Sequence, residues 1–104
     1  MFSASGVQME IKWLRNALLN LDQELNYIAQ SDPAAARMIM QRIHQAISHL
    51  IDNPASGQPG RIPGTRELVV QKTRYIIPYR IRPRTNTLEI LRVFHSSRKP
   101  PKNW

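Results

Sequence analysis

The sequence predicts a small α+β domain in which a helical hairpin packs on a mainly antiparallel sheet, with the element order β-α-α-β-β-β. Two apolar stripes with helical spacing occupy the first half of the chain, and three runs rich in β-branched and aromatic residues occupy the second. The 104 residues suit one domain of ordinary size. We expect the folded domain at residues 9–95, a flexible tail at residues 1–8 and a basic tail at residues 96–104.

The first two elements are a short strand and a helix. Residues 10–14 alternate polar and apolar side chains, as a half-buried strand does. From Asn16 the apolar period lengthens to steps of three and four, which predicts one buried stripe along a helix. The stripe consists of Leu14, Leu18, Leu21, Leu25 and Ile28.

A second helix follows after a short break. Asp32 can cap the first free amides, and Pro33 suits the first helical position, where no amide donor is needed. Asn53 and Pro54 end the helix. Its expected apolar face contains Ala36, Ile39, Ile43, Ala46, Ile47 and Leu50. Because the break between the helices is short, we expect an antiparallel helical hairpin.

The second half of the chain reads as a loop and three strands. Glycine and proline fill residues 54–64, and the strand-like runs follow at residues 67–71, 75–82 and 87–95. The turn residues at positions 83–86 join the last two runs into a hairpin. Pro78 lies inside the middle run and cannot donate to a ladder, so we expect a bulge there or an outward-facing position on an edge strand.

Charge is distributed unevenly along the chain. Residues 1–53 carry four basic and five acidic side chains, and residues 54–104 carry eleven basic and two acidic ones, so the net charge of +8 divides into −1 and +9. Eight of those eleven are arginines, whose forked donors suit carboxylate and phosphate. The basic half therefore predicts an interaction surface for an acidic protein or a nucleic-acid assembly.

The composition also limits the class of protein. The absence of cysteine favours a reducing compartment, the cytoplasm, and excludes thiol chemistry. No run approaches the ~20 apolar residues that a membrane-spanning helix needs, so we expect no membrane partner. His44 and His49 lie about 140° apart around a helix and cannot share a metal ion. We expect neither a metal nor a cofactor.

Basic and aromatic side chains remain as the candidate functional residues. There is no phosphate-binding loop, nucleophile elbow or carboxylate pair in the sequence. Arginines can stabilise a phosphorane and histidine or tyrosine can move a proton, but the same side chains also suit plain binding. Residue types alone leave both possibilities open. The candidates are Arg61, Arg66, Arg74, Tyr75, Tyr79, Arg80, Arg92, His95, Arg98 and Lys99.

Four strings stand in a fixed order from Met9 to Lys99, with the helix that contains Leu18, Leu21 and Ile28 between the first and the second. They are Ile11-Lys12-Trp13, Gly60-Arg61-x-x-Gly64-Thr65-Arg66-Glu67-Leu68, Tyr75-x-x-x-Tyr79-Arg80, and Leu88-Glu89-Ile90-Leu91-Arg92-Val93-Phe94-His95-x-x-Arg98. In this order and spacing the chain resembles the RelE/ParE superfamily of type II toxins, and most closely the ParE (plasmid stabilisation) branch.

The resemblance implies a toxin that a cognate, ParD-like or related antitoxin neutralises in a hetero-oligomer. Such a pair often represses its own operon, so we expect operator DNA to be contacted only indirectly, through the antitoxin. RelE-like members cleave mRNA on the ribosome. ParE-like members poison DNA gyrase and are not known to need a catalytic site.

Three departures from the RelE-like pattern bear on this choice. Ile76 follows Tyr75 where ribosome-dependent members usually have arginine, and Ser96 follows His95 where some have tyrosine. Residues 60–63 replace a lysine pair. We therefore expect a gyrase inhibitor without catalysis of its own.

Two alternatives remain open. One is a ribosome-dependent endoribonuclease that uses His95 with Arg61, Arg66 and Arg80 around the scissile phosphate. The other is a non-toxic basic interaction domain, which only the composition supports.

Overall fold

The computed structural model describes residues 9–100, 102 and 104; the tail expected at residues 1–8 lies outside the described residues. The elements are β1 (Glu10–Trp13), α1 (Arg15–Ser31), α2 (Pro33–Asp52), β2 (Gln58–Pro59), β3 (Arg66–Val69), β4 (Tyr75–Arg82), the 3-10 turn η2 (Pro83–Thr85), β5 (Thr87–Ile90) and β6 (Phe94–His95). The predicted α+β fold is confirmed. The short strands β2 and β6 are additions to the predicted order.

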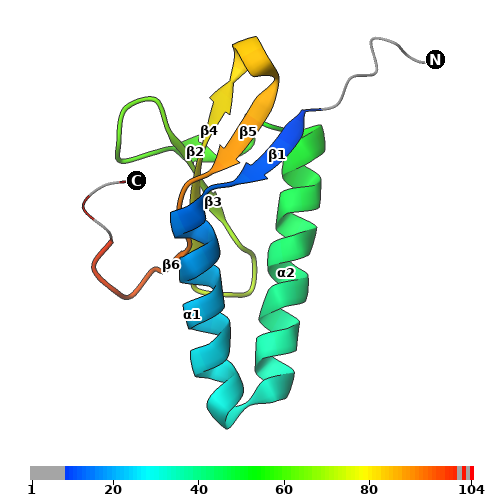
Figure 1. Ribbon diagram of the computed structural model, residues 1–104, viewed down its shortest axis with the longest axis vertical. Helices are drawn as coiled ribbons and strands as arrows, with labels where there is room; N and C mark the ends of the chain where they lie inside the picture. The colour runs from blue at the N-terminus through cyan, green and yellow to red at the C-terminus, as the bar shows by residue number, and fades with distance from the viewer. Residues whose placement is uncertain (1–8, 101, 103) are drawn as a thin grey trace, which may run out of the picture.

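The strands form one six-stranded sheet with the order β1-β5-β4-β3-β2, and β6 pairs with β4 beyond the end of β5. β1 runs parallel to β5, and every other pair is antiparallel, as expected for a mainly antiparallel sheet. The two helices run antiparallel to each other and cover one face of the sheet (Figure 1). We call the opposite face, which the helices leave uncovered, the outer face.

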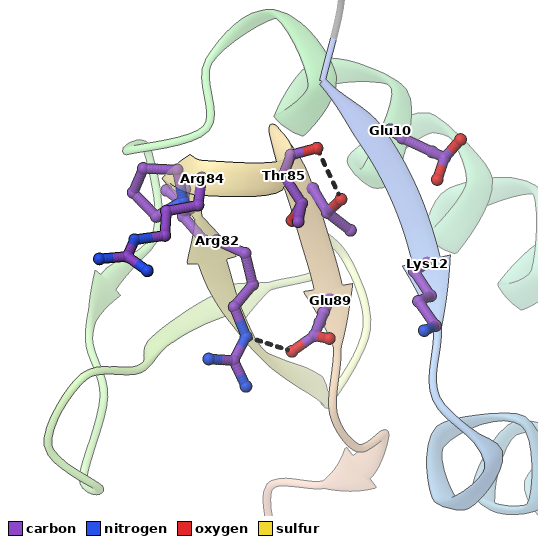
Figure 2. Close-up of a pocket in the computed structure, with 9 residues that line it drawn as sticks. Glu10, Lys12, Arg82, Arg84, Thr85 and Glu89 are labelled. Atoms are coloured by element: carbon purple, nitrogen blue, oxygen red, sulfur yellow. Dashed lines mark hydrogen bonds and ion pairs between the residues drawn. The ribbon is translucent and has the colours of Figure 1, made fainter.

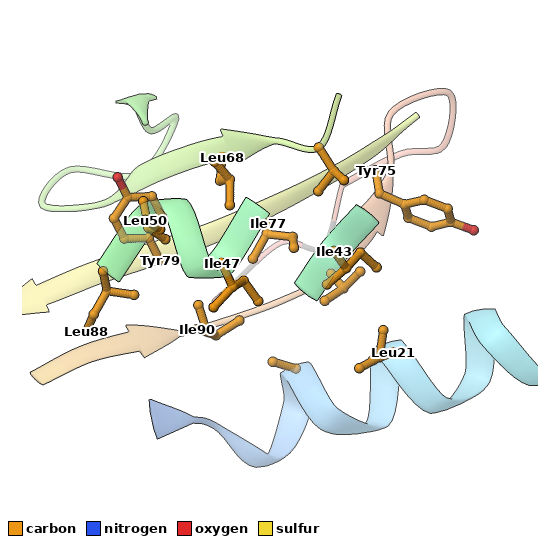
Figure 3. Packing of buried hydrophobic residues seen from close by; sticks show 13 residues of the cluster. Leu21, Ile43, Ile47, Leu50, Leu68, Tyr75, Ile77, Tyr79, Leu88 and Ile90 are labelled. Atoms are coloured by element: carbon orange, nitrogen blue, oxygen red, sulfur yellow. The ribbon is translucent and has the colours of Figure 1, made fainter. Parts of the chain in front are cut away.

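The core lies between the helical hairpin and the sheet (Figure 3). Ile43 and Leu50 of α2 and Ile77 of β4 are at most 2% exposed, and neighbouring strands add Leu88 and Ile90. Burying an aliphatic side chain of this size contributes about 1.5–3 kcal/mol. Alternation along the strands sends every second side chain into this core and the others to the outer face.

The buried stripe of α1 differs from the predicted one at Leu18. Leu18 is 50% exposed, whereas Ala17 and Leu21 are buried, with Leu25 and Ile28 partly buried against the core. The buried stripe thus keeps Leu21, Leu25 and Ile28 as predicted but includes Ala17 in place of Leu18. Ala17 is fully buried. A spacing rule that counts only large apolar residues misses such a small residue.

The connection between the helices is formed as predicted. Asp32 accepts a hydrogen bond from the Ala35 amide through its side chain at 3.0 Å, and Pro33 begins α2. The helix ends at Asn53, whose amide donates to the carbonyl of His49. Capping of this kind contributes about 1 kcal/mol to a helix.

Pro78 lies beside a bulge, which was one of its two predicted environments. β5 ends at Ile90 and β6 begins at Phe94, so the single strand expected at residues 87–95 is interrupted. The pairs Tyr79–Ile90 and Ile76–Phe94 differ in register by one residue. The carbonyl of Pro78 accepts from the Leu91 amide at 2.9 Å, and its missing donor faces the interruption. The edge alternative is wrong, because Pro78 is fully buried in a central strand.

Candidate interaction surface

Three charged side chains are cross-strand neighbours on the outer face: Lys12, Glu89 and Arg80. Lys12 of β1 is in register with Glu89 of β5, and Glu89 is in register with Arg80 of β4. Arg82 lies two residues further along β4 and therefore points to the same face. Three neighbouring strands thus place three cations around a single carboxylate.

Glu89 holds two of these arginines together. Its Oε1 atom accepts from the Nε of Arg80 at 2.6 Å and from the Nε of Arg82 at 3.1 Å. The glutamate side chain is 13% exposed, whereas the arginine side chains are 36% and 51% exposed. The carboxylate therefore lies beneath the guanidiniums, which are presented to the solvent. Hydrogen bonds from Arg80, and then from Arg82, hold the pKa of Glu89 below its usual range.

A pocket of about 850 Å³ opens beside this group (Figure 2). It is lined by Lys12 and Glu10 of β1, by Glu89, and by Arg82 and Arg84 at the hairpin end. Glu10 lies two residues before Lys12 on β1 and also lines the pocket, but the acid that contacts the arginines is Glu89. This arrangement suits an anionic ligand.

A second ion pair lies further along the outer face. Arg61 forms a bidentate pair with Glu67, from Nε to Oε2 at 2.8 Å and from Nη2 to Oε1 at 3.0 Å. Its guanidinium also lies 5.2 Å from the centre of the Phe94 ring, which stacks on Trp104. The hydrogen bonds from Arg61 hold the pKa of Glu67 below its usual range. Trp104 brings part of the basic tail into contact with the domain.

A third group joins the start of the tail to α1. Glu24 accepts from the Tyr75 hydroxyl at 2.9 Å and from Nη1 of Arg98. Burial, followed by the bond to Glu24, raises the pKa of Tyr75 to about 12. The His95 ring packs edge-on against Tyr75, and its Nδ1 lies 2.7 Å from the Ser97 hydroxyl.

The structure separates the three arginines assigned to the nuclease alternative. Arg66 lies on the helix side of the sheet, where its Nη1 donates to the carbonyls of Ala55 and Gly57. Arg61 and Arg80 lie on the outer face, each paired with its own glutamate. Arg66 therefore does not share a face of the sheet with Arg61 and Arg80.

The other predicted candidates fall into different environments. Tyr79 is fully buried, so it lies in the core and not on the surface. Its hydroxyl donates to the Pro54 carbonyl at 2.6 Å and accepts from the Gly57 amide at 3.0 Å. Arg92 is half-buried, and its Nε has no hydrogen-bond partner within the part of the chain that the structure describes. Arg74 and Lys99 are exposed near His95 and Arg98, respectively.

The predicted site omitted Lys12, Arg82, Arg84, Glu89 and Glu24. The turn at residues 83–86 was recognised, and its length alone places Arg82 opposite Thr87 and Arg80 opposite Glu89. The sequence therefore contained a signal for the Arg80–Glu89 pair. The contact of Glu24 with Arg98 joins residues 74 positions apart and has no local signal.

Within residues 9–100, 102 and 104, there is no group of three or more potential ligands that could hold a metal ion. Over the same residues, every helix is too short or too polar to cross a membrane.

Comparison with known proteins gives concordant results. Residues 11–100 match the sequence profile of the ParE toxin of the type II toxin–antitoxin system parDE. The chain is 46% identical over 92 residues to Y4kP of Sinorhizobium fredii, which is named as a candidate toxin; the match covers 88% of this chain and 93% of Y4kP.

Two solved structures have the same fold. A chain of the chromosomal ParDE system from P. aeruginosa superposes with a TM-score of 0.73 at 27% identity, covering 84% of this chain and 95% of that one. A chain of the RelBE2 toxin–antitoxin complex from Mycobacterium tuberculosis superposes with a TM-score of 0.59 at 24% identity. The match covers 86% of this chain and 99% of that one, and it supports the fold alone. The chain therefore belongs to the ParE toxin family of type II toxin–antitoxin systems.

Proposed function

We propose that this protein inhibits DNA gyrase in the cytoplasm and that a cognate antitoxin keeps it inactive. The observation that carries the proposal is the match to the ParE toxin family over residues 11–100. The placement of Arg66 adds support, because it lies on the opposite face of the sheet from Arg61 and Arg80 and the three do not converge on one point. A toxin that binds its target needs no such point.

The proposal extends to the surface near the tail, which we expect to contact gyrase. Exposed Arg74 lines a pocket of about 280 Å³ together with Tyr75, His95 and Arg98, and exposed Lys99 follows Arg98 in the chain. Truncating an arginine in an interface often costs more than about 1.4 kcal/mol, or more than about tenfold in affinity. The purified protein should reduce ATP-dependent supercoiling by gyrase and trap a cleavage complex.

Variants locate the contact in the same assay. We expect Arg74→Ala to need about tenfold more protein for equal inhibition. Arg37→Ala, which removes an equal charge from an exposed position on α2, should behave as the wild type. Supercoiling that continues unchanged at every concentration of wild-type protein would contradict the proposed function.

The endoribonuclease alternative keeps one supporting observation. His95 lines the same pocket as Tyr75 and Arg98, so a proton-transferring group and cations lie together there. Primer extension on translated mRNA tests this alternative directly. Codon-linked cuts that disappear in His95→Ala would favour the endoribonuclease alternative. If the protein inhibits gyrase and produces no cuts in mRNA, this alternative is excluded.

We further propose that the antitoxin covers apolar side chains on the helical hairpin. Leu18 and Leu19 of α1 and Met38 and Met40 of α2 are 46–53% exposed, which is unusual for large apolar residues on two adjacent helices. Apolar contacts of this kind usually supply most of the binding energy, and the cations of the second half would speed association with an acidic partner.

A further inference from the structure

The Arg80–Glu89–Arg82 group has an unusual distribution of donors. Both arginines meet Glu89 through Nε, and each guanidinium carries further N–H donors on its two Nη atoms. One carboxylate cannot neutralise two guanidiniums, so the group keeps a charge of +1. Because the arginines are more exposed than Glu89, this charge is presented at the surface of the sheet. The carboxylate orients the arginines, which lowers the entropy lost when they bind an anion.

Further cations extend the group into a row. Arg80 and Arg82 are separated by two residues of a strand, or about 6.6–6.8 Å at the usual rise. Arg84 continues the row at the hairpin end, and Lys12 lies two strands from Arg80. A row of this kind matches a polymer with regularly spaced anions better than it matches one small ion.

The backbone around the row favours one of two anionic polymers, an extended acidic peptide or a nucleic acid. β5 is paired on both sides at Glu89, and β4 is paired with β5 at Arg80 and Arg82, so the main-chain groups between these two strands are occupied by the ladder. An extended peptide is usually held at a sheet edge through main-chain hydrogen bonds, which the centre of the row, between β4 and β5, does not offer. A nucleic-acid backbone needs only side-chain donors to its phosphates.

We propose that the outer face, centred on Arg82 with Arg80, Lys12 and Arg84, binds the phosphodiester backbone of DNA without reading its sequence. The choice of DNA over RNA rests on the proposed function, because gyrase holds DNA when it is inhibited. The site lies on the sheet at the hairpin end, apart from the pocket near the tail that is proposed to contact gyrase. It would let the toxin contact enzyme and DNA together.

The test is a fluorescence anisotropy titration of a short labelled DNA duplex with the full chain at several salt concentrations. The logarithm of the association constant falls with the logarithm of salt concentration, by about 0.9 for each phosphate contact. We expect Arg82→Ala to weaken binding at low salt and to reduce this slope by about 0.9. Arg37→Ala removes the same charge from exposed α2, on the other side of the sheet, and should keep the wild-type slope.

Circular dichroism of each variant checks that it is folded, which we expect because Arg82 is half-exposed. Several results would overturn the proposal: no salt-dependent binding by the wild type, equal losses in the Arg82 and Arg37 variants, or equal binding of polyglutamate. Binding of RNA in preference to DNA would also overturn it and would favour the nuclease alternative.

Gyrase is absent from this titration, so the two proposals can fail separately. A wild-type protein that inhibits gyrase but does not bind DNA contradicts the DNA site only. A wild-type protein that binds DNA through Arg82 but leaves supercoiling unchanged contradicts the gyrase function only.

Discussion

The two faces of the sheet use the same residue types for different purposes. On the helix side, Tyr79 and Arg66 direct polar groups to backbone atoms of residues 54–57, and these bonds hold the loop against the sheet. On the outer face, Arg80 and Arg82 meet a single carboxylate and remain 36% and 51% exposed. Tyr79 and Arg66 thus support the fold, whereas Arg80 and Arg82 are presented to the solvent, according to the parity of their positions in the paired strands.

Residue type alone therefore does not identify the functional surface of this protein. Tyr79 and Arg80 are neighbours in sequence, and both belonged to the predicted site. One is fully buried, whereas the other lies on the outer face. Substitutions on the helix side should therefore cost stability, and those on the outer face should cost binding.

The largest effect is expected at Tyr79. Replacing a buried aromatic residue by alanine leaves a cavity and typically costs about 3–5 kcal/mol. Tyr79→Phe should cost about 1–3 kcal/mol, because it leaves the Pro54 carbonyl and the Gly57 amide without their partner. Urea denaturation with a constant m-value measures both changes.

Tyr27→Ala is the matched control for these variants. Tyr27 is 69% exposed on α1, and a substitution there should change the free energy of unfolding by no more than about 0.5 kcal/mol. If Tyr79→Ala were as mild as this control, the distinction between the two faces would be wrong.

The local parts of the fold were predictable, and the parts that depend on distant contacts were not. Asp32 and Pro33 mark a helix start within two residues, and the hairpin turn at residues 83–86 is equally local. The interruption between Ile90 and Phe94 depends on how β4 pairs with two different strands. No pattern within residues 87–95 contains that information.

The candidate site was predicted less well than the fold. Composition indicated the basic half, but the pairing of Arg61 with Glu67 and of Arg98 with Glu24 decides which charges face outward. Glu24 lies in the nearly neutral helical half, so a charge count for each half cannot reveal its role. Side-chain direction and distant pairing are properties of the folded chain.

The second-largest effect is expected on the free energy of unfolding at alkaline pH, and it involves Tyr75 on the helix side. The raised pKa of Tyr75, about 12 against an ordinary value of about 10, means that the folded state favours the protonated phenol. The protonated phenol of Tyr75 stabilises the fold fully below about pH 10. This stabilisation is lost as the pH rises toward 12, by up to about 1.4 kcal/mol per pH unit. Burial raises the pKa of Tyr79 in the same direction.

Tyr75→Phe removes one of these two groups. We expect the alkaline fall in the free energy of unfolding to become shallower than in the wild type, measured by urea denaturation between pH 9 and about pH 12. Glu24→Gln should give an intermediate slope, because burial is the larger cause of the shift and remains in place. A Tyr75→Phe slope equal to that of the wild type would show that the phenol does not couple to unfolding.

The smallest effect is expected on the outer face at acidic pH. Because hydrogen bonds from arginine lower the pKa of Glu67 and Glu89, each glutamate stabilises the fold above its ordinary pKa of about 4.3. This stabilisation is lost as the pH falls below that value and through the folded-state pKa. With half-exposed arginine partners, Glu67→Gln and Glu89→Gln should each cost only about 0.5–1 kcal/mol at pH 7.

Urea midpoints at pH 7 and about pH 3 test this expectation, since protonation of the wild-type glutamates should remove most of the difference from the glutamine variants. High salt should also reduce the difference at pH 7, as it does for exposed ion pairs. A cost for Glu89→Gln that matched Tyr79→Ala and persisted in salt would make the Arg80–Glu89–Arg82 group a structural element. Its arginines would then be needed for folding, and a loss of DNA binding in Arg82→Ala could not be assigned to a lost contact. A small, salt-sensitive cost instead leaves these arginines free to bind a partner.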